Sequence, residues 1–439
     1  MLHRRLEKSS RQGWLGVTKG SEWSTTTELL GKTSKWRRGE KMVQVFGFDA
    51  LAARSRDHLA NSAPAQICLS NDLRDFAALW PRSDRLGAAR CYVFQCADIL
   101  ELKCDTFAIA QSAEPLFVAI LGHAADPLLL VPLSMEGHHP NRVLKFLDGG
   151  LSDYNAPVLF PPVANWDAKT MRMIWRSLRK LLPPFDIAVF DRMPDRVDDL
   201  PNPLSLLSTS AHGESGHAAH LYGTWEDFAR KLPRRREMRL KARRLGKIGN
   251  MTFEIASNPE QYEVFLETLI RQKRQRYFKT WEKQGLDRLG YRAYLTKAKR
   301  LLYPTGPVCL FALKVNETII ATAWGYVVGR RFYTVLQSFE TGWDSYSPGH
   351  VLFEELFKWC FAQGLGAFDL GVGDEKYKDE YCDIRIILRE AVIPATVLRW
   401  TRRWIGNNIP FVRHIYNWSR SDSVAALPAR DWDRECEES

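Results

Sequence analysis

The clearest pattern of apolar and polar positions lies between residues 332 and 373. FYTVLQSFE (332–340) is rich in β-branched and aromatic residues and predicts a strand, and the polar TGWDSYSPGH (341–350) predicts a loop. VLFEELFKWCFAQG (351–364) has the spacing of an amphipathic helix and ends on glycine, and AFDLGVG (367–373) predicts a second strand. The predicted order is therefore strand, loop, helix, strand.

The preceding part of the chain, residues 43–222, also alternates between helical and strand patterns. It predicts helices at 71–80 and 171–182 and strands at 115–123, 127–135 and 186–193. Such an alternation is typical of an α/β domain. The stretch 208–222 is rich in Ser, Gly and Ala and predicts a flexible linker.

Two basic helical stretches follow this linker. Thr224 is placed to cap a helix, with Glu226 and Asp227 in its first turn, where the helix dipole favours acidic residues. Residues 234–247 then hold eight basic residues and one acid above a thin apolar stripe, and residues 271–279 add five more basic residues. These stretches predict either a patch for a phosphate-rich substrate, with Arg236 and Arg243 among its contacts, or a solvated helix face.

Composition narrows the class of protein. The chain has 439 residues, 45% of them hydrophobic and 26% charged, which is typical of a globular protein of two or three domains. Its net charge of +11 favours an anionic partner, and no apolar run approaches the length of a membrane span. We therefore expect a cytoplasmic protein.

The two ends of the chain differ from its middle. Residues 1–41 contain ten Lys and Arg against four Glu and predict a disordered basic extension, which is either a binding arm or an artefact of an upstream start. Residues 396–439 form a tail in which tryptophans alternate with arginines before an acidic end. Its aromatic residues either pack back on the domain or contact the inner face of a membrane.

Metal binding is not expected. The eight cysteines lack the paired spacing of zinc sites, and His212, His217 and His220 have no nearby Asp or Cys to complete a ligand set. We interpret the cysteines as buried thiols and the three histidines as residues of the predicted linker.

The stretch SPGHVLFEELFKWCFAQGLGAFDLGVGDEKYKDEY (347–381) resembles the C-terminal half of FemAB-like and CelD-like acyltransferases of the GNAT superfamily. The resemblance extends, more weakly upstream, over roughly residues 90–395. It implies an α/β fold of tandem GNAT-like domains, with mixed sheets flanked by helices. The corresponding division is 1–41 as extension, 42–222 and 223–395 as the two GNAT-like domains, and 396–439 as tail.

The start of the helix at 351 is a candidate anion site. Pro348 and Gly349 stand where the helix should open, so free backbone N–H groups near Gly349, His350 and Val351, preceded by Ser347, are expected to bind a pyrophosphate. The resemblance implies that this pyrophosphate belongs to acetyl-CoA or another acyl-CoA. His350 is also a candidate base.

Candidate catalytic residues lie on the two flanking strands and the loop that follows. Asp369 interrupts an apolar strand, where a buried carboxylate gains the raised pKa of a general base or serves as a structural acceptor. The resemblance implies that Gln337 supports an oxyanion site made by the backbone of its strand. It also implies that Tyr377 protonates the leaving thiolate and that Lys376 or Lys378 neutralises negative charge in a basic loop.

Together these features predict an acyltransferase that moves an acyl group from acyl-CoA to an amine or hydroxyl of a saccharide or envelope precursor in polysaccharide biosynthesis. Two alternatives stay open: a non-catalytic GNAT-like binding or scaffold protein, and a transferase that uses aminoacyl-tRNA. The partner is then an anionic small molecule or saccharide. DNA is not expected, and RNA is expected only as the aminoacyl donor.

Overall fold

The computed structural model describes residues 46–47 and 66–395, except 123–124, 139–140, 162, 164–165 and 281–287. All described elements belong to one unit of the chain that begins at Lys41. The predicted extension at 1–41 and tail at 396–439 lie outside the described residues. Of the helices in the described part, none is long and apolar enough to cross a membrane.

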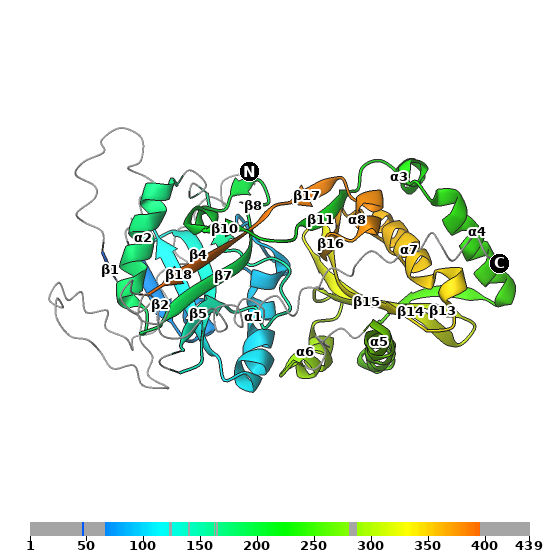
Figure 1. The fold of residues 1–439 in the computed structure, drawn as a ribbon, viewed down its shortest axis with the longest axis horizontal. Helices are drawn as coiled ribbons and strands as arrows, with labels where there is room; N and C mark the ends of the chain where they lie inside the picture. The colour runs from blue at the N-terminus through cyan, green and yellow to red at the C-terminus, as the bar shows by residue number, and fades with distance from the viewer. Residues whose placement is uncertain are drawn as a thin grey trace, which may run out of the picture. The chain divides into compact units, whose positions relative to one another are not determined.

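The first sheet has nine strands in the described chain, ordered β1-β2-β3-β4-β5-β7-β18-β10, with β6 paired to β4 (Figure 1). Its pairs are antiparallel except β5 with β7, which is parallel. The strands are β1 (Phe46–Gly47), β2 (Gln66–Ser70), β3 (Glu114–Leu121), β4 (Pro127–Glu136), β5 (Val143–Phe146), β6 (Val158–Leu159), β7 (Ile187–Pro194), β10 (Ser210–Ala211) and β18 (Leu388–Pro394).

The second sheet has seven strands in the described chain, ordered β12-β13-β14-β15-β16-β11-β17, and only β15 and β16 pair in parallel. The strands are β11 (Gly216–His220), β12 (Met251–Ile255), β13 (Val308–Val315), β14 (Thr318–Val328), β15 (Arg331–Phe339), β16 (Ala367–Val372) and β17 (Ile384–Ile386). A small antiparallel ribbon joins β8 (Arg196–Val197) to β9 (Leu200–Pro201).

Helices flank both sheets. They are α1 (Ala97–Lys103), α2 (Ala168–Leu181), α3 (Trp225–Lys231), α4 (Arg235–Ile248), α5 (Pro259–Thr280), α6 (Tyr291–Lys297), α7 (Pro348–Ala362) and α8 (Lys376–Tyr381). Mixed sheets covered by helices confirm the predicted α/β class.

Local signals account for several of these elements. Thr224 and Asp227 form a reciprocal capping box at the start of α3, as predicted from the sequence. The strands predicted at 115–123 and 127–135 form the antiparallel pair β3 and β4. The helix predicted at 71–80 is wrong in extent, since only a 3₁₀ turn, Leu73–Phe76, forms before Pro81, which cannot continue a helix.

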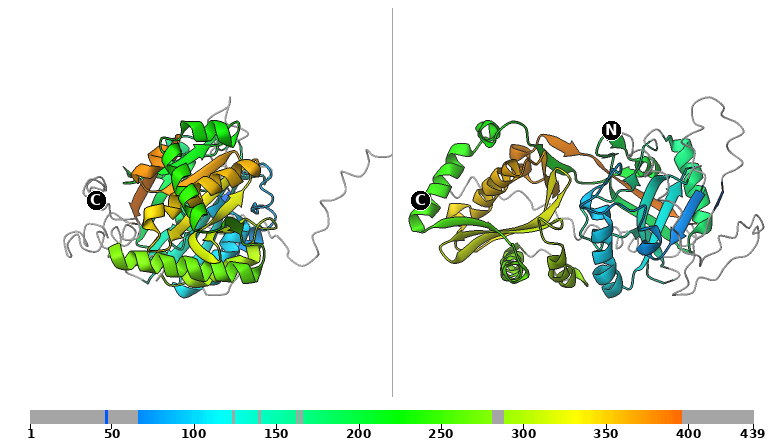
Figure 2. Two further views of the ribbon diagram at one scale, coloured as in Figure 1. Left: turned by 90° about the vertical axis from the view of Figure 1, so that its right-hand side faces the viewer. Right: turned by 180° about the vertical axis from the view of Figure 1, so that it is seen from behind.

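The core of the second sheet lies under α7. Phe357 of α7 contacts Phe368 of β16 with ring centroids 4.5 Å apart, and both side chains are fully buried. On the opposite face, α5 bonds to β14 through Gln272, which accepts a 2.8 Å hydrogen bond from the Thr322 hydroxyl. Figure 2 shows α5 and α7 on opposite sides of this sheet. The strands β15 and β16 are therefore held between two helical layers.

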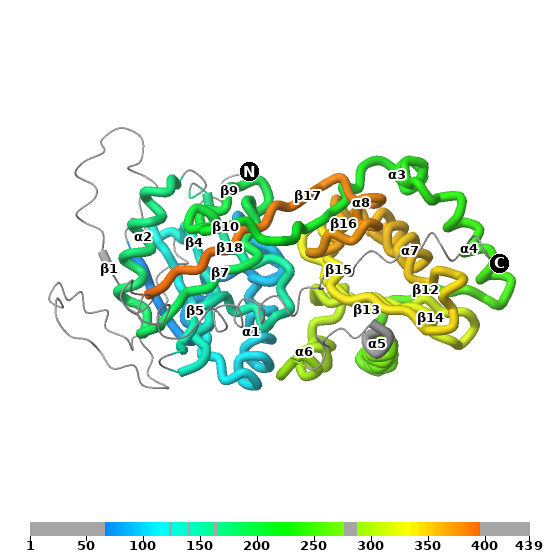
Figure 3. The backbone as a smooth tube through the Cα atoms, viewed as in Figure 1, coloured from blue at the N-terminus to red at the C-terminus, as the bar shows by residue number. Residues whose placement is uncertain are grey.

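The chain passes twice between the two sheets. It leaves β10 of the first sheet to enter β11 of the second, and later leaves β17 of the second to enter β18 of the first (Figure 3). Consequently β11 lies in the predicted N-terminal domain, 42–222, but belongs to the second sheet. Conversely, β18 lies in the predicted C-terminal domain, 223–395, but belongs to the first sheet. The flexible linker predicted at 208–222 is wrong, because it contains the strands β10 and β11, and β11 is bonded on both edges.

Candidate functional site

A wedge opens between strands β15 and β16. Their parallel register is limited to Arg331–Tyr333 on β15 and Ala367–Asp369 on β16, although β15 continues to Phe339. Beyond Tyr333 the two strands therefore part. Strands that part in this way leave backbone groups of the sheet open to a ligand.

A β-bulge lies on β15 at the mouth of this wedge. On its other edge, Thr334 pairs with Gly325 and Leu336 pairs with Trp324, so Val335 has no partner in the β14 register. Such a bulge interrupts the ladder of hydrogen bonds and redirects backbone groups. This is the segment in which the sequence predicted a backbone oxyanion site.

Three buried polar side-chain atoms accompany the bulge: Thr334 Oγ1, Gln337 Oε1 and Ser338 Oγ have no hydrogen-bond partner within the described chain. Thr334 is 7% exposed and Ser338 is 2% exposed, so water does not easily reach either side chain. Gln337 donates through Nε2 to the Tyr377 hydroxyl at 3.4 Å, which brings two predicted catalytic residues together. Buried polar atoms without partners are costly, so a polar ligand that reached these atoms would gain hydrogen bonds.

The N-terminus of α7 lies at the end of the loop that follows β15. Pro348 opens the helix, and Ser347 precedes it in the left-handed conformation with φ of 49°. The expectation of three free N–H groups is wrong for two of them, because those of His350 and Val351 donate to the Ser347 carbonyl at 3.1 and 3.2 Å. The third predicted donor, the Gly349 N–H, has no backbone hydrogen bond among the described residues.

Charged side chains of both signs lie near this helix start. Lys241 of α4 donates to the Ser345 carbonyl at 2.9 Å, which fastens α4 to the loop before α7. Burial lowers the pKa of His350; the negative charges of Glu380 and Glu237 oppose this shift, and the positive charges of Arg234 and Lys241 add to it. A neutral His350 is suited to hydrogen bonding rather than to a fixed positive charge. Arg236 and Arg243, the predicted substrate contacts, are exposed on α4.

Asp369 is fully buried, and both of its oxygens are bonded. Oδ1 accepts hydrogen bonds from the Tyr154 hydroxyl at 2.8 Å and from the Gly371 N–H at 2.9 Å, and Arg331 donates to Oδ2 at 3.4 Å. Burial raises the pKa of Asp369, while these three donors oppose the rise. The contacts favour the alternative in which Asp369 is a structural acceptor, since the side chain is fully buried and each oxygen accepts a hydrogen bond from within the fold.

A second carboxylate, Asp153, lies where the strands part. Gly371 adopts φ of +73°, and a Cβ atom at this glycine would lie 2.6 Å from Asp153 Oδ2 and 3.5 Å from the Thr334 carbonyl oxygen. Asp153 therefore fills the space that the missing side chain leaves beside the wedge. Burial raises its pKa to about 7, with Arg192 and Lys378 opposing the rise. A carboxyl with a pKa near neutrality is suited to general-base catalysis.

The sequence did not identify Asp153. It stands after Gly149 and Gly150, where an aspartate is an ordinary turn residue. Its partner Gly371 is distant along the chain, so no local pattern indicates their contact.

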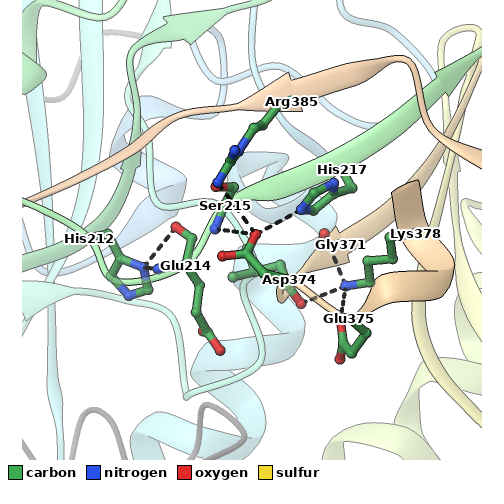
Figure 4. A network of polar contacts seen from close by, with 10 residues as sticks. His212, Glu214, Ser215, His217, Gly371, Asp374, Glu375, Lys378 and Arg385 are labelled. Carbon is green, nitrogen blue, oxygen red and sulfur yellow. Dashed lines mark hydrogen bonds and ion pairs between the residues drawn. The ribbon is translucent and has the colours of Figure 1, made fainter. Parts of the chain in front are cut away.

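The predicted basic loop after β16 is wrong as a loop, because Lys376–Tyr381 form the short helix α8. Lys378 is 2% exposed and donates to the Val372 carbonyl at 2.9 Å, and its ammonium pairs with Glu375 at 3.0 Å (Figure 4). Lys376 is exposed. Of the two predicted lysines, Lys378 is the one that lies beside Gly371 and the wedge.

The same segment is tied to β11. His217 Nε2 lies 2.9 Å from Asp374 Oδ1, and the Ser215 N–H donates to the same oxygen at 3.3 Å. Arg385 in turn donates to the Ser215 hydroxyl at 2.9 Å, as Figure 4 shows. This network fixes the turn between β16 and α8. Among the described residues, no group of three or more His, Cys, Asp or Glu side chains is arranged to hold a metal ion.

Comparison with known proteins shows which domain and which solved structures this chain is similar to. Residues 233–379 match the family model described as Acetyltransferase (GNAT) domain. The solved structure of FemX is similar to this chain with a TM-score of 0.50 and 11% identity, over 72% of this chain and 95% of that one. The fold is a GNAT fold.

Two other solved structures are also similar in fold. L-PGS from Bacillus licheniformis has a TM-score of 0.43 and 13% identity, over 74% of this chain and 97% of that one. A tandem GNAT protein from the clavulanic acid biosynthesis pathway has a TM-score of 0.40 and 10% identity, over 74% of this chain and 94% of that one. A search of curated proteins found no match. The wedge, the bulge and the start of α7 all lie within the matched GNAT domain.

Proposed function

We propose that this protein is an acyltransferase whose acyl donor lies in the wedge between β15 and β16. The observation that carries the proposal is the parting of these strands after Tyr333, beside a bulge and the unpartnered atoms of Thr334 and Gln337. A thioester carbonyl needs hydrogen-bond donors placed where negative charge develops, and an interrupted β-strand supplies them. The match of residues 233–379 to a GNAT acetyltransferase domain supports the same assignment.

The residues present fit an acyl-CoA. The N–H of Gly349 and the flanking Lys241 suit a pyrophosphate at the positive end of α7. The oxygens of Thr334 and Gln337, which lack partners among the described residues, suit the amide and hydroxyl groups of a pantetheine arm along β15. Acetyl-CoA is therefore our first choice of donor, with longer acyl-CoAs as further candidates.

The transfer step uses Asp153 as proton acceptor. The acceptor nitrogen or oxygen bonds to the acyl carbon, the carbon–sulfur bond breaks, and the proton of the acceptor moves to Asp153. Tyr377, which accepts a 3.4 Å hydrogen bond from Gln337, donates its own proton to the leaving thiolate, and proton exchange with solvent restores Tyr377 and Asp153 after product release. Asp369 positions the strand by bonding Tyr154 and Gly371. Most of the acceleration then comes from placement and from the backbone donors.

The acceptor we propose is an amine or hydroxyl of a saccharide or envelope precursor, in a polysaccharide pathway. This choice rests on the resemblance to FemAB-like and CelD-like enzymes and on the net charge of +11, which favours an anionic acceptor. Aminoacyl-tRNA is the second candidate donor, because it is the donor in some relatives of the resembled FemAB-like family, and FemX is similar to this chain in fold. A scaffold protein with the same fold is the candidate from another class.

Calorimetric titration with acetyl-CoA tests the donor. Gly349→Pro removes the N–H at the start of α7, where proline is tolerated in a helix, whereas Gly349→Ala keeps the N–H. The added Cβ of the alanine control lies 3.4 Å from the nearest Phe339 atom, which is an ordinary contact. We expect micromolar binding that is weakened about tenfold or more by Gly349→Pro and little by Gly349→Ala.

The outcomes separate the candidates. Binding that both variants weaken equally places the donor elsewhere. Absence of binding to every thioester overturns the acyl-CoA version and leaves aminoacyl-tRNA, tested by transfer from a labelled aminoacyl-tRNA. Donor binding with a turnover that Asp153→Asn leaves unchanged contradicts the catalytic role of Asp153.

A further inference from the structure

The outer face of α4 is strongly basic and contains exposed aliphatic side chains. The exposed cations of this helix are Arg236, Arg239, Arg243, Arg244 and Lys247, against the single acid Glu237. Leu240 and Ile248 are each 45% exposed, which is high for large aliphatic residues. Charge and apolar surface therefore occur on the same element.

Helical geometry places these residues on one side. Met238 and Leu245 are the buried residues of α4, and they define the side that faces the domain. At about 100° per residue, Arg236, Leu240 and Lys247 lie within roughly 20° of the direction opposite Met238. Leu240 thus stands at the centre of the outer face, surrounded by cations. Buried packing of the domain does not explain its position.

We propose that this outer face of α4 docks on an anionic lipid surface. A helix that binds in the membrane interface combines cations that attract lipid headgroups with aliphatic side chains that enter the acyl boundary. RNA also attracts cations, but its recognition in single strands uses aromatic stacking, and α4 has no aromatic residue. The central Leu240 makes a lipid surface the better match.

The docking face is connected to the wedge. Lys241, on the inner side of α4, bonds the Ser345 carbonyl in the loop before α7. Arg234, just before α4, pairs with Glu380 of α8 at 3.3 Å. The outer face of α4 is therefore separated only by α4 itself from the loop before α7 and from α8, which lie beside the wedge. The proposal does not depend on the acyl donor or on catalysis.

The charge requirement is tested with the full chain and sedimenting vesicles. The vesicles contain phosphatidylcholine either alone or with about one-third phosphatidylglycerol, where each cation near the surface contributes roughly fivefold in affinity. The test variant is Arg236→Gln/Arg243→Gln, and the matched control is Arg172→Gln/Arg176→Gln, two exposed arginines of α2. We expect binding only to the anionic vesicles, at least tenfold weaker in the test variant and unchanged in the control.

The apolar requirement is tested separately. Leu240→Gln removes the central aliphatic group, and Val264→Gln on α5 is the control, since Val264 is 59% exposed. We expect a several-fold loss for Leu240→Gln alone. Circular dichroism of each variant confirms that the helices are intact.

Three results would overturn the proposal. They are equal binding to neutral and anionic vesicles, no binding to either, and equal losses in test and control variants. A parallel titration of fluorescent tRNA distinguishes the RNA alternative. If Arg236→Gln/Arg243→Gln weakens tRNA binding but not vesicle binding, the partner of α4 is RNA.

Discussion

Replacing Asp153 with Asn should change the stability of the protein in a manner that depends on pH. Burial raises the pKa of Asp153 from 3.8 to about 7, against the opposing charges of Arg192 and Lys378. In the unfolded chain this carboxyl loses its proton at about 3.8, so the folded state binds one more proton between 3.8 and about 7. Stability is therefore full below the unfolded pKa and is lost as the pH rises toward the folded pKa.

The magnitude follows from the size of the shift. About three pH units at about 1.4 kcal/mol each give at most about 4 kcal/mol of lost unfolding free energy above pH 7. Asp153 is not completely enclosed, so screening by water brings the expected value to about 2–4 kcal/mol. Asn has a similar shape and no charge, and the Asp153→Asn variant therefore lacks this loss.

Urea unfolding of the two proteins at pH 5, 6, 7 and 8 measures the effect. The unfolding free energy of the variant minus that of the wild type should rise by roughly 1 kcal/mol per pH unit up to pH 7 and then stay constant. Asp374→Asn is the control without pH dependence: hydrogen bonds from His217 and Ser215 outweigh burial and lower the pKa of Asp374 below 3.8, so this carboxyl is ionised in the folded and the unfolded state throughout pH 5–8. A difference between Asp153→Asn and wild type that does not vary with pH would refute the reasoning.

Four further substitutions test the packing and the wedge. Tyr154→Phe removes the 2.8 Å hydrogen bond to the buried Asp369 and should lower the unfolding free energy by about 1.5–3 kcal/mol in urea titrations. Gly216→Ala should cost about 1–3 kcal/mol, because its Cβ would lie 2.5 Å from the Tyr154 hydroxyl oxygen. Gly246→Ala, which meets nothing within 4 Å on α4, should instead stabilise by about 0.5–1 kcal/mol. Thr334→Val removes a buried hydroxyl that lacks a partner in the described chain, so we expect unchanged or slightly higher melting temperature together with weaker acetyl-CoA binding by calorimetry.

The order of elements around the wedge could be predicted from the sequence because its signals are local. Alternation of apolar positions predicted β15 and β16, and proline and glycine predicted the start of α7. Asp369 was also a local signal, since a charged residue in an apolar strand must have a partner. The identity of that partner was not local, because Tyr154 is 215 residues away.

The exchange of strands between the sheets could not be predicted for the same reason. The sequence of β11 contains small residues and two histidines, which indicates a linker when its neighbours are unknown. In the fold β11 is bonded to β16 on one edge and to β17 on the other. Tertiary pairing thus overrides a weak local preference for coil.

Burial raises the pKa of both carboxyl groups near the wedge, Asp153 and Asp369. Their surroundings differ and suit them to different roles. Both oxygens of Asp369 accept hydrogen bonds, from Tyr154, Gly371 and Arg331, so the carboxyl is fixed in place and holds β16 in position. Asp153 is opposed mainly by charges, and its carboxyl faces the open side of Gly371. Gly371 serves both, because its N–H binds one carboxylate and its missing side chain makes room for the other. A carboxyl with a pKa of about 7 beside a rigidly anchored strand is suited to the proton removal at neutral pH that we propose for Asp153.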